Sequence, residues 1–200
     1  SVVPELSNIA RIDTQILFSL FSENITPKHW TKIAKAVAKQ ITEGVDGVVI
    51  AHGTDTMGYT AAALSFALQE LPVPVILAGS QRSADRPSSD AATNLIGAVT
   101  AAARAPFAEV AVAMHETTSD TSITLHRGTK VRKCHTSKRD TFKSVNTSPM
   151  ARVQDQKITM LTKDYWRRDP TRKLALKPKF DEKVALIKFY PSIDPKIISW

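Results

Sequence analysis

The sequence predicts an α/β fold in which a parallel sheet is flanked by helices, similar to Rossmann-like and flavodoxin-like domains. Short apolar runs alternate with helical patterns between residues 26 and 114. This alternation is typical of βαβ units, whose strands pair in parallel beneath covering helices. Glycine and polar residues follow the apolar runs directly, as they do where buried strands end at one edge of a sheet.

The first predicted helix begins after Thr26 and ends near Gly44. Threonine is a favourable N-cap, and Pro27 suits the first helical position because its missing N–H would have no partner there. Glycine is favoured just beyond the last turn of a helix. Apolar residues recur at helical spacing between these limits: Trp30, Ile33, Ala34, Val37 and Ile41.

Two strands and a helix follow this first helix. The apolar run Val48–Ala51 predicts a buried strand, and a helix is expected at about Gly58–Glu70. Val73–Ala78 predicts the next strand, with Gly79–Gln81 as its exit loop. A third helix and another strand complete this alternation: Ser88, Ser89 and Asp90 are expected to cap a helix through Ala103, and a strand is predicted near Glu109–Met114.

The pattern changes beyond residue 118 and predicts a domain boundary. Residues 119–162 are rich in threonine, with short β-branched pieces that indicate hairpins and loops. Residues 164–182 are polar and basic and contain two prolines, which indicates a linker. The run KVALIKFY at 183–190 predicts a new strand. We therefore predict an α/β domain at 1–163, a linker at 164–182 and, at 183–200, the start of a smaller C-terminal α/β domain.

Composition predicts a soluble cytoplasmic protein with a basic second half. No apolar run approaches the length of about 20 residues that a membrane-spanning helix needs. The single cysteine excludes a disulfide within the chain and fits a reducing compartment. Residues 1–125 carry 8 Lys or Arg against 12 Asp or Glu, whereas residues 126–200 carry 19 against 7. This basic half indicates either an anionic partner such as nucleic acid or a solvated lysine-rich surface.

Two predicted strand ends carry polar groups suited to chemistry. His52–Thr56 (HGTDT) follows one strand and Gly79–Arg82 follows the next, so both are expected at the ligand-binding edge of the sheet. Thr54 offers a hydroxyl that a base would have to activate, and Asp55 offers a carboxylate. The alternative is that Thr54 or Asp55 only caps the following helix.

Distant blocks of the sequence weaken that alternative, because together they resemble the L-asparaginase-type amidohydrolases. Ser22 and Glu23 stand where that family places its contacts to the substrate carboxylate and ammonium groups. The other matching positions are His52–Thr56, Thr60, Ala61, Asn94, Leu95, Lys133 and Phe142–Ser144. The resemblance extends over essentially the whole chain, and HGTDT is its most specific part.

The resemblance implies hydrolysis of a side-chain amide by a threonine, through an acyl-enzyme and with no metal or organic cofactor. It implies catalytic roles for Thr54, Asp55 and Lys133, and substrate contacts from Ser22, Glu23, Gly53, Thr54 and Asp55. A lysine serves as the base only when desolvation or neighbouring cations lower its pKa from about 10.4. Three such cations lie near Lys133 in sequence: Lys130, Arg132 and Lys138.

Three further blocks carry a closer resemblance: residues 22–27 (SENITP), 79–90 (GSQRSADRPSSD) and 126–133 (HRGTKVRK). By these blocks the chain looks most similar, within that family, to the D subunits of archaeal-type glutamyl-tRNA(Gln) amidotransferases. This similarity implies release of ammonia from glutamine or asparagine for a tRNA-binding partner subunit, with ATP and Mg²⁺ on that partner. It also implies indirect contact with tRNA, a homodimeric core and no membrane. The alternatives are a free-standing cytosolic L-asparaginase and a non-catalytic interaction domain.

The family also has a threonine in a Gly-Gly-Thr turn after its first strand, usually assigned as the primary nucleophile. No Gly-Gly-Thr occurs in the 200 residues. We therefore expect the first strand and that turn to precede residue 1, and we expect the isolated chain to be inactive.

Other candidate sites are weaker. Five histidines lack the spacing of a metal site, and glycine-rich phosphate loops are absent from the sequence. Cys134 is expected to be a small core residue rather than a reactive thiol. Tyr59 is expected to pack against the core rather than take part in chemistry.

Overall fold

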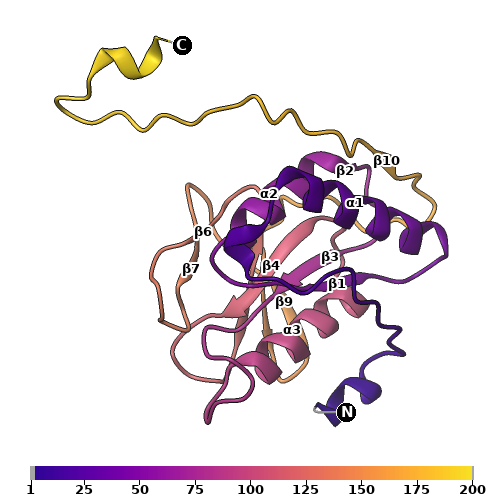
Figure 1. Cartoon of the computed structure of the whole chain (residues 1–200). Coiled ribbons are helices and arrows are strands. Elements are labelled where there is room, and N and C mark those ends of the chain that lie inside the picture. The colour runs from indigo at the N-terminus through magenta and orange to yellow at the C-terminus, as the bar shows by residue number, and fades with distance from the viewer. Residues whose placement is uncertain (1–2, 200) are drawn as a thin grey trace.

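The computed structural model describes residues 3–199 and shows a sheet covered by helices on both faces (Figure 1). Within those residues the main sheet has six strands in the order β1-β3-β4-β5-β8-β9. Helices α1 and α2 pack against one face and α3 packs against the other. The strands are β1 Val48–Ala51, β3 Val75–Ala78, β4 Val110–His115, β5 Ile123–Arg127, β8 Ala151–Gln154 and β9 Lys157–Met160.

The parallel α/β prediction is confirmed for the first half of the sheet. Strands β1, β3 and β4 pair in parallel, whereas β5, β8 and β9 continue the sheet in antiparallel pairs. The connections from β4 to β5 and from β8 to β9 are too short for a parallel pair, which needs a long crossover, whereas an antiparallel pair needs only a turn. Within the region 119–162, β5, β8 and β9 therefore extend the sheet, whereas β6 and β7 form a separate hairpin.

The helices begin close to the predicted residues. Helix α1 spans Pro27–Thr42 with Thr26 as its N-cap, α2 spans Met57–Ala67 and α3 spans Ala91–Arg104. Helix α2 ends three residues earlier than predicted. The reason is that the next two residues, β2 Leu68–Gln69, pair with β10 Ala175–Leu176 from the end of the body.

The core follows the alternation of side chains along each strand. All four residues of β3 are buried: Val75 and Leu77 face α1 and α2, whereas Ile76 and Ala78 face α3. Alanines line the inner side of α3, which lets its backbone approach the sheet closely. At the closest point, a Cβ added to Gly47 would lie 2.2 Å from the carbonyl oxygen of Ala102.

We expect Gly47→Ala to lower the free energy of unfolding by about 2 kcal/mol, because backbone rather than a flexible side chain meets the added methyl. Gly58→Ala is the matched control, since a Cβ added to Gly58 in helix α2 would make only an ordinary contact, 3.4 Å from the backbone oxygen of Val131. That substitution should leave stability unchanged or raise it by up to about 1 kcal/mol. Urea unfolding of both variants measures the two effects, and equal stability would contradict the close approach at Gly47.

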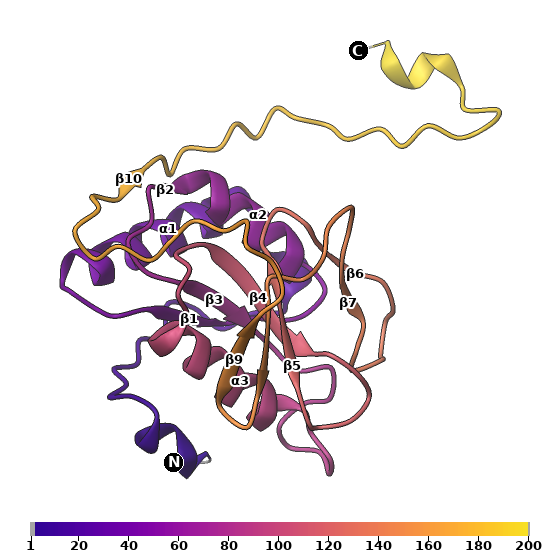
Figure 2. The ribbon, with the colours of Figure 1, turned by 180° about the vertical axis from the view of Figure 1, so that it is seen from behind.

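A two-stranded hairpin stands beside the main sheet and carries Lys133 (Figure 2). Its strands are β6 Val131–Lys133 and β7 Phe142–Ser144, and Lys133 is paired with Phe142. The Phe142 side chain is buried in the core that α1 and α2 cover. This anchor explains why a short exposed hairpin holds a fixed place.

Residues after 163 lie along the surface of the body before the chain leaves it. Lys177 donates its N–H to the carbonyl of Ala67, and the Phe180 ring contacts the Trp30 ring edge-on, with centroids 5.5 Å apart. This is the segment that the sequence predicts as a linker.

Residues 183–190 form no strand in the described structure, and the start of a C-terminal domain stays a prediction. The segment is extended, exposed and unpaired, and leads away from the body to the short helix η3 Pro195–Ile198 (Figure 1). Within residues 3–199 no strand pairs with it, so its apolar residues have no surface to cover. None of the helices described between residues 3 and 199 has the length and apolar character needed to cross a bilayer.

Candidate active site

The corner between β1 and α2 is built by more than helix capping. The N-cap of α2 is Thr56, and its hydroxyl donates to the backbone oxygen of Ser22 at 2.7 Å instead of capping the helix. Thr54 and Asp55 precede this cap and are directed elsewhere. The capping explanation for these two residues is therefore wrong.

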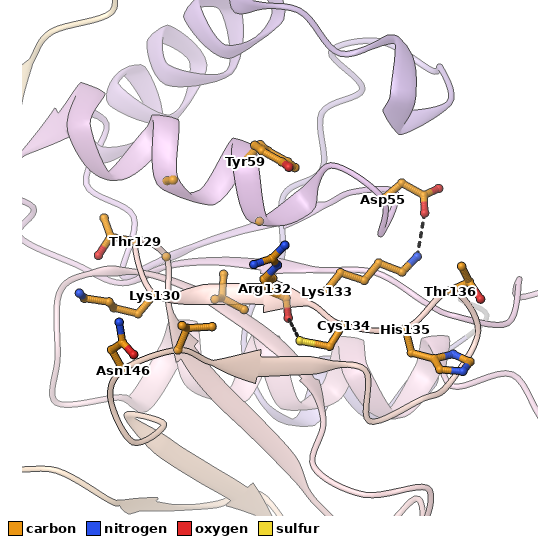
Figure 3. A pocket seen from close by; sticks show the side chains of 15 residues that line it. Asp55, Tyr59, Thr129, Lys130, Arg132, Lys133, Cys134, His135, Thr136 and Asn146 are labelled. Atoms are coloured by element: carbon orange, nitrogen blue, oxygen red, sulfur yellow. Dashed lines mark hydrogen bonds and ion pairs between the residues drawn. The ribbon is translucent and has the colours of Figure 1, made fainter. Parts of the chain in front are cut away.

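Lys133 meets both of them from the hairpin, 79 residues later in the chain than Thr54. Its Nζ lies 2.8 Å from the hydroxyl oxygen of Thr54. The same Nζ lies 2.8 Å from Oδ1 of Asp55 (Figure 3). The lysine side chain is 14% exposed, whereas that of Asp55 is 65% exposed. The structure thus brings together the three residues that the sequence selects as catalytic.

The predicted substrate-binding residues surround the same corner. A Cβ on Gly53 would lie 2.7 Å from Cβ of Ser22, so glycine is required for this contact. Ser22 is buried and Glu23 is exposed beside it, in the turn η2 Ser22–Asn24. Among the described hydrogen bonds, none joins Glu23 to Thr54 or Lys133. Gly53 and Ser22 therefore form the wall of the site, with Glu23 at its rim.

The end of β3 lies against this corner, as expected for neighbouring parallel strands. A Cβ on Gly79 would be 2.3 Å from the backbone oxygen of His52 and 3.2 Å from Cγ2 of Thr54. Glycine is needed at this close approach because any larger residue would displace the backbone behind Thr54.

His52 is held as a neutral ring behind Gly53. Its Nδ1 lies 2.6 Å from the Gly53 carbonyl oxygen, an acceptor only, so Nδ1 carries the proton. Its Nε2 lies 2.9 Å from the Thr60 hydroxyl, which itself accepts from the Trp30 indole N–H at 3.0 Å. Burial lowers the pKa of His52, while the bond to Gly53 opposes that shift. The chain of bonds fixes the Gly53–Thr54 peptide.

A hollow of about 730 Å³ opens beside Asp55 and Lys133 (Figure 3). Lys130 and Arg132 line it, so two of the three predicted cations share this space with Lys133. Two predictions are wrong here. Tyr59 is 67% exposed at the hollow because it lies on the outward face of α2, and Cys134 is exposed because β6 ends at Lys133.

Sequence patterns missed how the loop after β3 is held. Asp90 is buried and precedes α3 as its N-cap residue, but its carboxylate does not cap that helix. It accepts the backbone N–H of Gln81 at 3.0 Å and of Arg82 at 2.9 Å. The expected capping by Asp90 is therefore wrong. Asp90 lies twelve residues after the end of β3, and the geometry of the intervening loop determines which groups its carboxylate binds.

The arrangement suits proton transfer at an oxygen. The lysine nitrogen, which is 14% exposed, lies within hydrogen-bonding distance of both a threonine hydroxyl and a carboxylate. Among residues 3–199, no three His, Cys, Asp or Glu side chains gather as a metal site would require.

Comparisons with known proteins agree on one family. Residues 1–166 match the family model described as "Asparaginase, N-terminal". Over 198 residues the chain is 53% identical to the D subunit of the glutamyl-tRNA(Gln) amidotransferase from Metallosphaera sedula, covering 98% of this chain and 45% of the relative. The corresponding D subunit from Sulfurisphaera tokodaii is 51% identical over 200 residues, with 99% and 44% covered. The chain therefore spans less than half the length of these relatives.

Solved structures give the same result. The thermostable L-asparaginase from Thermococcus kodakarensis superposes with a TM-score of 0.84 at 32% identity, covering 97% of this chain and 57% of that one. L-asparaginase I from Vibrio cholerae superposes with a TM-score of 0.77 at 34% identity, covering 90% and 52%.

Proposed function

The chain belongs to the asparaginase family, and on that premise we propose that it forms the amide-hydrolysing part of a tRNA-dependent amidotransferase. The observation that supports hydrolysis is the contact of Lys133 Nζ with the Thr54 hydroxyl and the Asp55 carboxylate, both at 2.8 Å. The observation that supports a role in an amidotransferase is the difference in sequence identity between two groups of relatives. Identity is 51–53% to the two amidotransferase D subunits and 32–34% to the two asparaginases.

In the proposed reaction, Lys133 moves a proton at a threonine oxygen. As an amine, Nζ accepts the Thr54 hydroxyl proton, and the oxygen attacks the side-chain amide carbon of glutamine or asparagine. The tetrahedral intermediate collapses, the C–N bond breaks, and the departing nitrogen takes a proton and leaves as ammonia. Water then attacks the ester and restores the hydroxyl. Asp55 orients Nζ and balances its charge while it holds the proton.

The wall of the site supplies substrate contacts in this proposal. Ser22 and Glu23 are placed to meet the carboxylate and ammonium groups of the amino acid, and Gly53 lets its backbone approach the developing oxyanion. The ATP and Mg²⁺ that activate tRNA-bound glutamate belong to the partner subunit, so no step on this chain requires them.

The test is ammonia release by the complete gene product, with glutamine or asparagine as substrate. We expect glutamine hydrolysis to rise about 10-fold when the tRNA-binding partner subunit and glutamyl-tRNA(Gln) are added, because the partner's tRNA-bound state favours the active arrangement. Asparagine preferred and hydrolysed equally well without the partner would establish the alternative, a free-standing asparaginase. No release under either condition would leave only a non-catalytic interaction domain.

A further inference from the structure

The segment that follows Lys133 is an exposed loop between the two strands of its hairpin. Residues 134–141, which we call the Lys133 loop, leave β6 and return to β7. At the base of the loop, Thr141 accepts two N–H groups: that of Cys134 on its carbonyl at 2.9 Å and that of His135 on its hydroxyl at 2.6 Å. Most of the loop surface is exposed. Within the loop, His135 Nδ1 also accepts the N–H groups of Ser137 at 3.1 Å and Lys138 at 3.2 Å. These bonds shape the loop, whereas its position on the body depends on contacts to other segments.

Arg139 connects this loop to two other loops. Its guanidinium donates to the backbone oxygen of Ser88, to that of Thr118 at 3.4 Å and to Oδ1 of Asp120 at 3.0 Å. These acceptors belong to the loop after β3 and the loop after β4. The Arg139 side chain is only 19% exposed, unlike a surface ion pair of small energetic value. One side chain thus joins three loops.

Asp120 is connected in turn to the corner that holds Thr54. The fully buried His115 places Nε2 2.8 Å from Oδ1 of Asp120 and Nδ1 2.6 Å from Oδ1 of Asn94. Asn94 donates to the Gly79 carbonyl at 2.9 Å. Gly79 is the residue that lies against Thr54. Hydrogen bonds therefore run without a break from Arg139 to the backbone behind the Thr54 side chain.

A second set of hydrogen bonds also attaches the Lys133 loop to the segment after β3. The Gln81 side-chain amide donates to the backbone oxygens of Thr136 at 3.2 Å and Lys138 at 2.9 Å. The buried Asp90 carboxylate fixes the Gln81 backbone. The Lys133 loop is thus attached at two points to the segment that begins at Gly79.

We propose that Arg139 is a positioning residue for the amide hydrolysis, which holds the Lys133 loop so that Lys133 Nζ stays within reach of the Thr54 hydroxyl. The proposal rests on the function proposed above. A lysine side chain is long and flexible, so the place of its backbone decides whether Nζ meets its partner. Displacement of about 1 Å at a reacting group is enough to lower a rate roughly 100-fold. Arginine suits the task because its planar fork serves several acceptors together.

The experiment compares three variants of the complete gene product in ammonia release from glutamine. For Arg139→Gln we expect kcat to fall about 10- to 100-fold while KM changes less than about 3-fold, because the loss concerns the reacting groups rather than substrate affinity. Arg139→Lys should recover only part of kcat, since an ammonium cannot reach all three acceptors. Arg152→Gln is the matched control: that arginine pairs with Glu116 near the same loop after β4 but has no contact with the Lys133 loop.

Amide hydrogen exchange tests the role of Arg139 independently of whether the protein hydrolyses an amide. In Arg139→Gln, the amides of residues 134–141 should exchange at least about 10-fold faster than in the unchanged protein, with no such change in Arg152→Gln. An unchanged kcat in an active protein with Arg139→Gln would overturn the positioning role. Equal loss of kcat in both variants would overturn it as well. If the unchanged protein released no ammonia, the proposed function would fail, and unchanged exchange at 134–141 would independently refute the attachment by Arg139.

Discussion

Replacing Lys133 by methionine is expected to abolish ammonia release from glutamine while leaving the fold intact. Methionine keeps the length and apolar stem of lysine but has no amine to contact the Thr54 hydroxyl at 2.8 Å. Removing a group that transfers the proton at a nucleophile lowers rates by about 10²- to 10⁴-fold. We therefore expect kcat to fall by roughly 1,000-fold in the complete gene product, measured with its partner and glutamyl-tRNA(Gln) present.

Lys143→Met is the matched control for this change. Lys143 lies on the other strand of the same hairpin, 51% exposed and paired with Asp140, and contacts neither Thr54 nor Asp55 among the described bonds. It should keep near-normal turnover. Circular dichroism and thermal unfolding check that both variants fold. More than about a tenth of normal turnover with Lys133→Met would remove Lys133 from the proposed mechanism.

The candidate site was predictable from sequence because its chemistry is concentrated in short blocks. HGTDT follows a recognisable strand, so its place at the edge of a parallel sheet follows from strand and helix patterns alone. Lys133 lies 79 residues from Thr54, and only the resemblance to a family joined the two. Neither the periodicity of the sequence nor the spacing of its motifs predicts that contact, because the contact depends on how the hairpin packs against the sheet.

The rest of the site depends on loop packing, which sequence patterns do not encode. Arg139 belongs to a basic stretch that resembles any solvated surface, yet its side chain is only 19% exposed and joins its own loop to two others. The run at 183–190 forms no strand for a related reason. Its apolar residues fit a strand, but a strand forms only where a neighbour offers backbone groups.

A buried histidine that contacts the hairpin carrying Lys133 is the expected cause of acid sensitivity. His126 on β5 is 3% exposed, and its Nδ1 lies 2.9 Å from the hydroxyl oxygen of Ser144 on β7. No hydrogen-bond partner within residues 3–199 meets its Nε2. Burial, with help from the charge of Lys143 and against that of Glu116, lowers the pKa of His126 to about 4.

This shift predicts that the folded state loses stability as the pH falls from about 6.5 to about 4. In that range the unfolded chain binds a proton at residue 126 and the folded chain does not, so each proton bound favours unfolding. The pKa difference corresponds to about 3 kcal/mol, fully lost near pH 4 and fully regained above pH 6.5. Urea unfolding at a series of pH values measures the slope.

Two variants isolate the contribution of His126. His126→Gln should flatten the stability curve between pH 6.5 and 4, because glutamine does not titrate. Ser144→Ala should lower stability by about 1 kcal/mol at neutral pH through the lost hydrogen bond, yet keep the slope because the histidine remains. Equal slopes in the unchanged protein and His126→Gln would show that this histidine is not the titrating group.

The position of His126 links this loss of stability to the site. A proton on His126 has to be accommodated beneath β7, and β7 pairs directly with the strand that ends at Lys133. The hairpin is short, and its own backbone bonds are few. It should therefore loosen before the six-stranded sheet unfolds. Between pH 6 and 5, hydrogen exchange at residues 131–144 should accelerate in the unchanged protein and not in His126→Gln, and amide hydrolysis should decline in parallel.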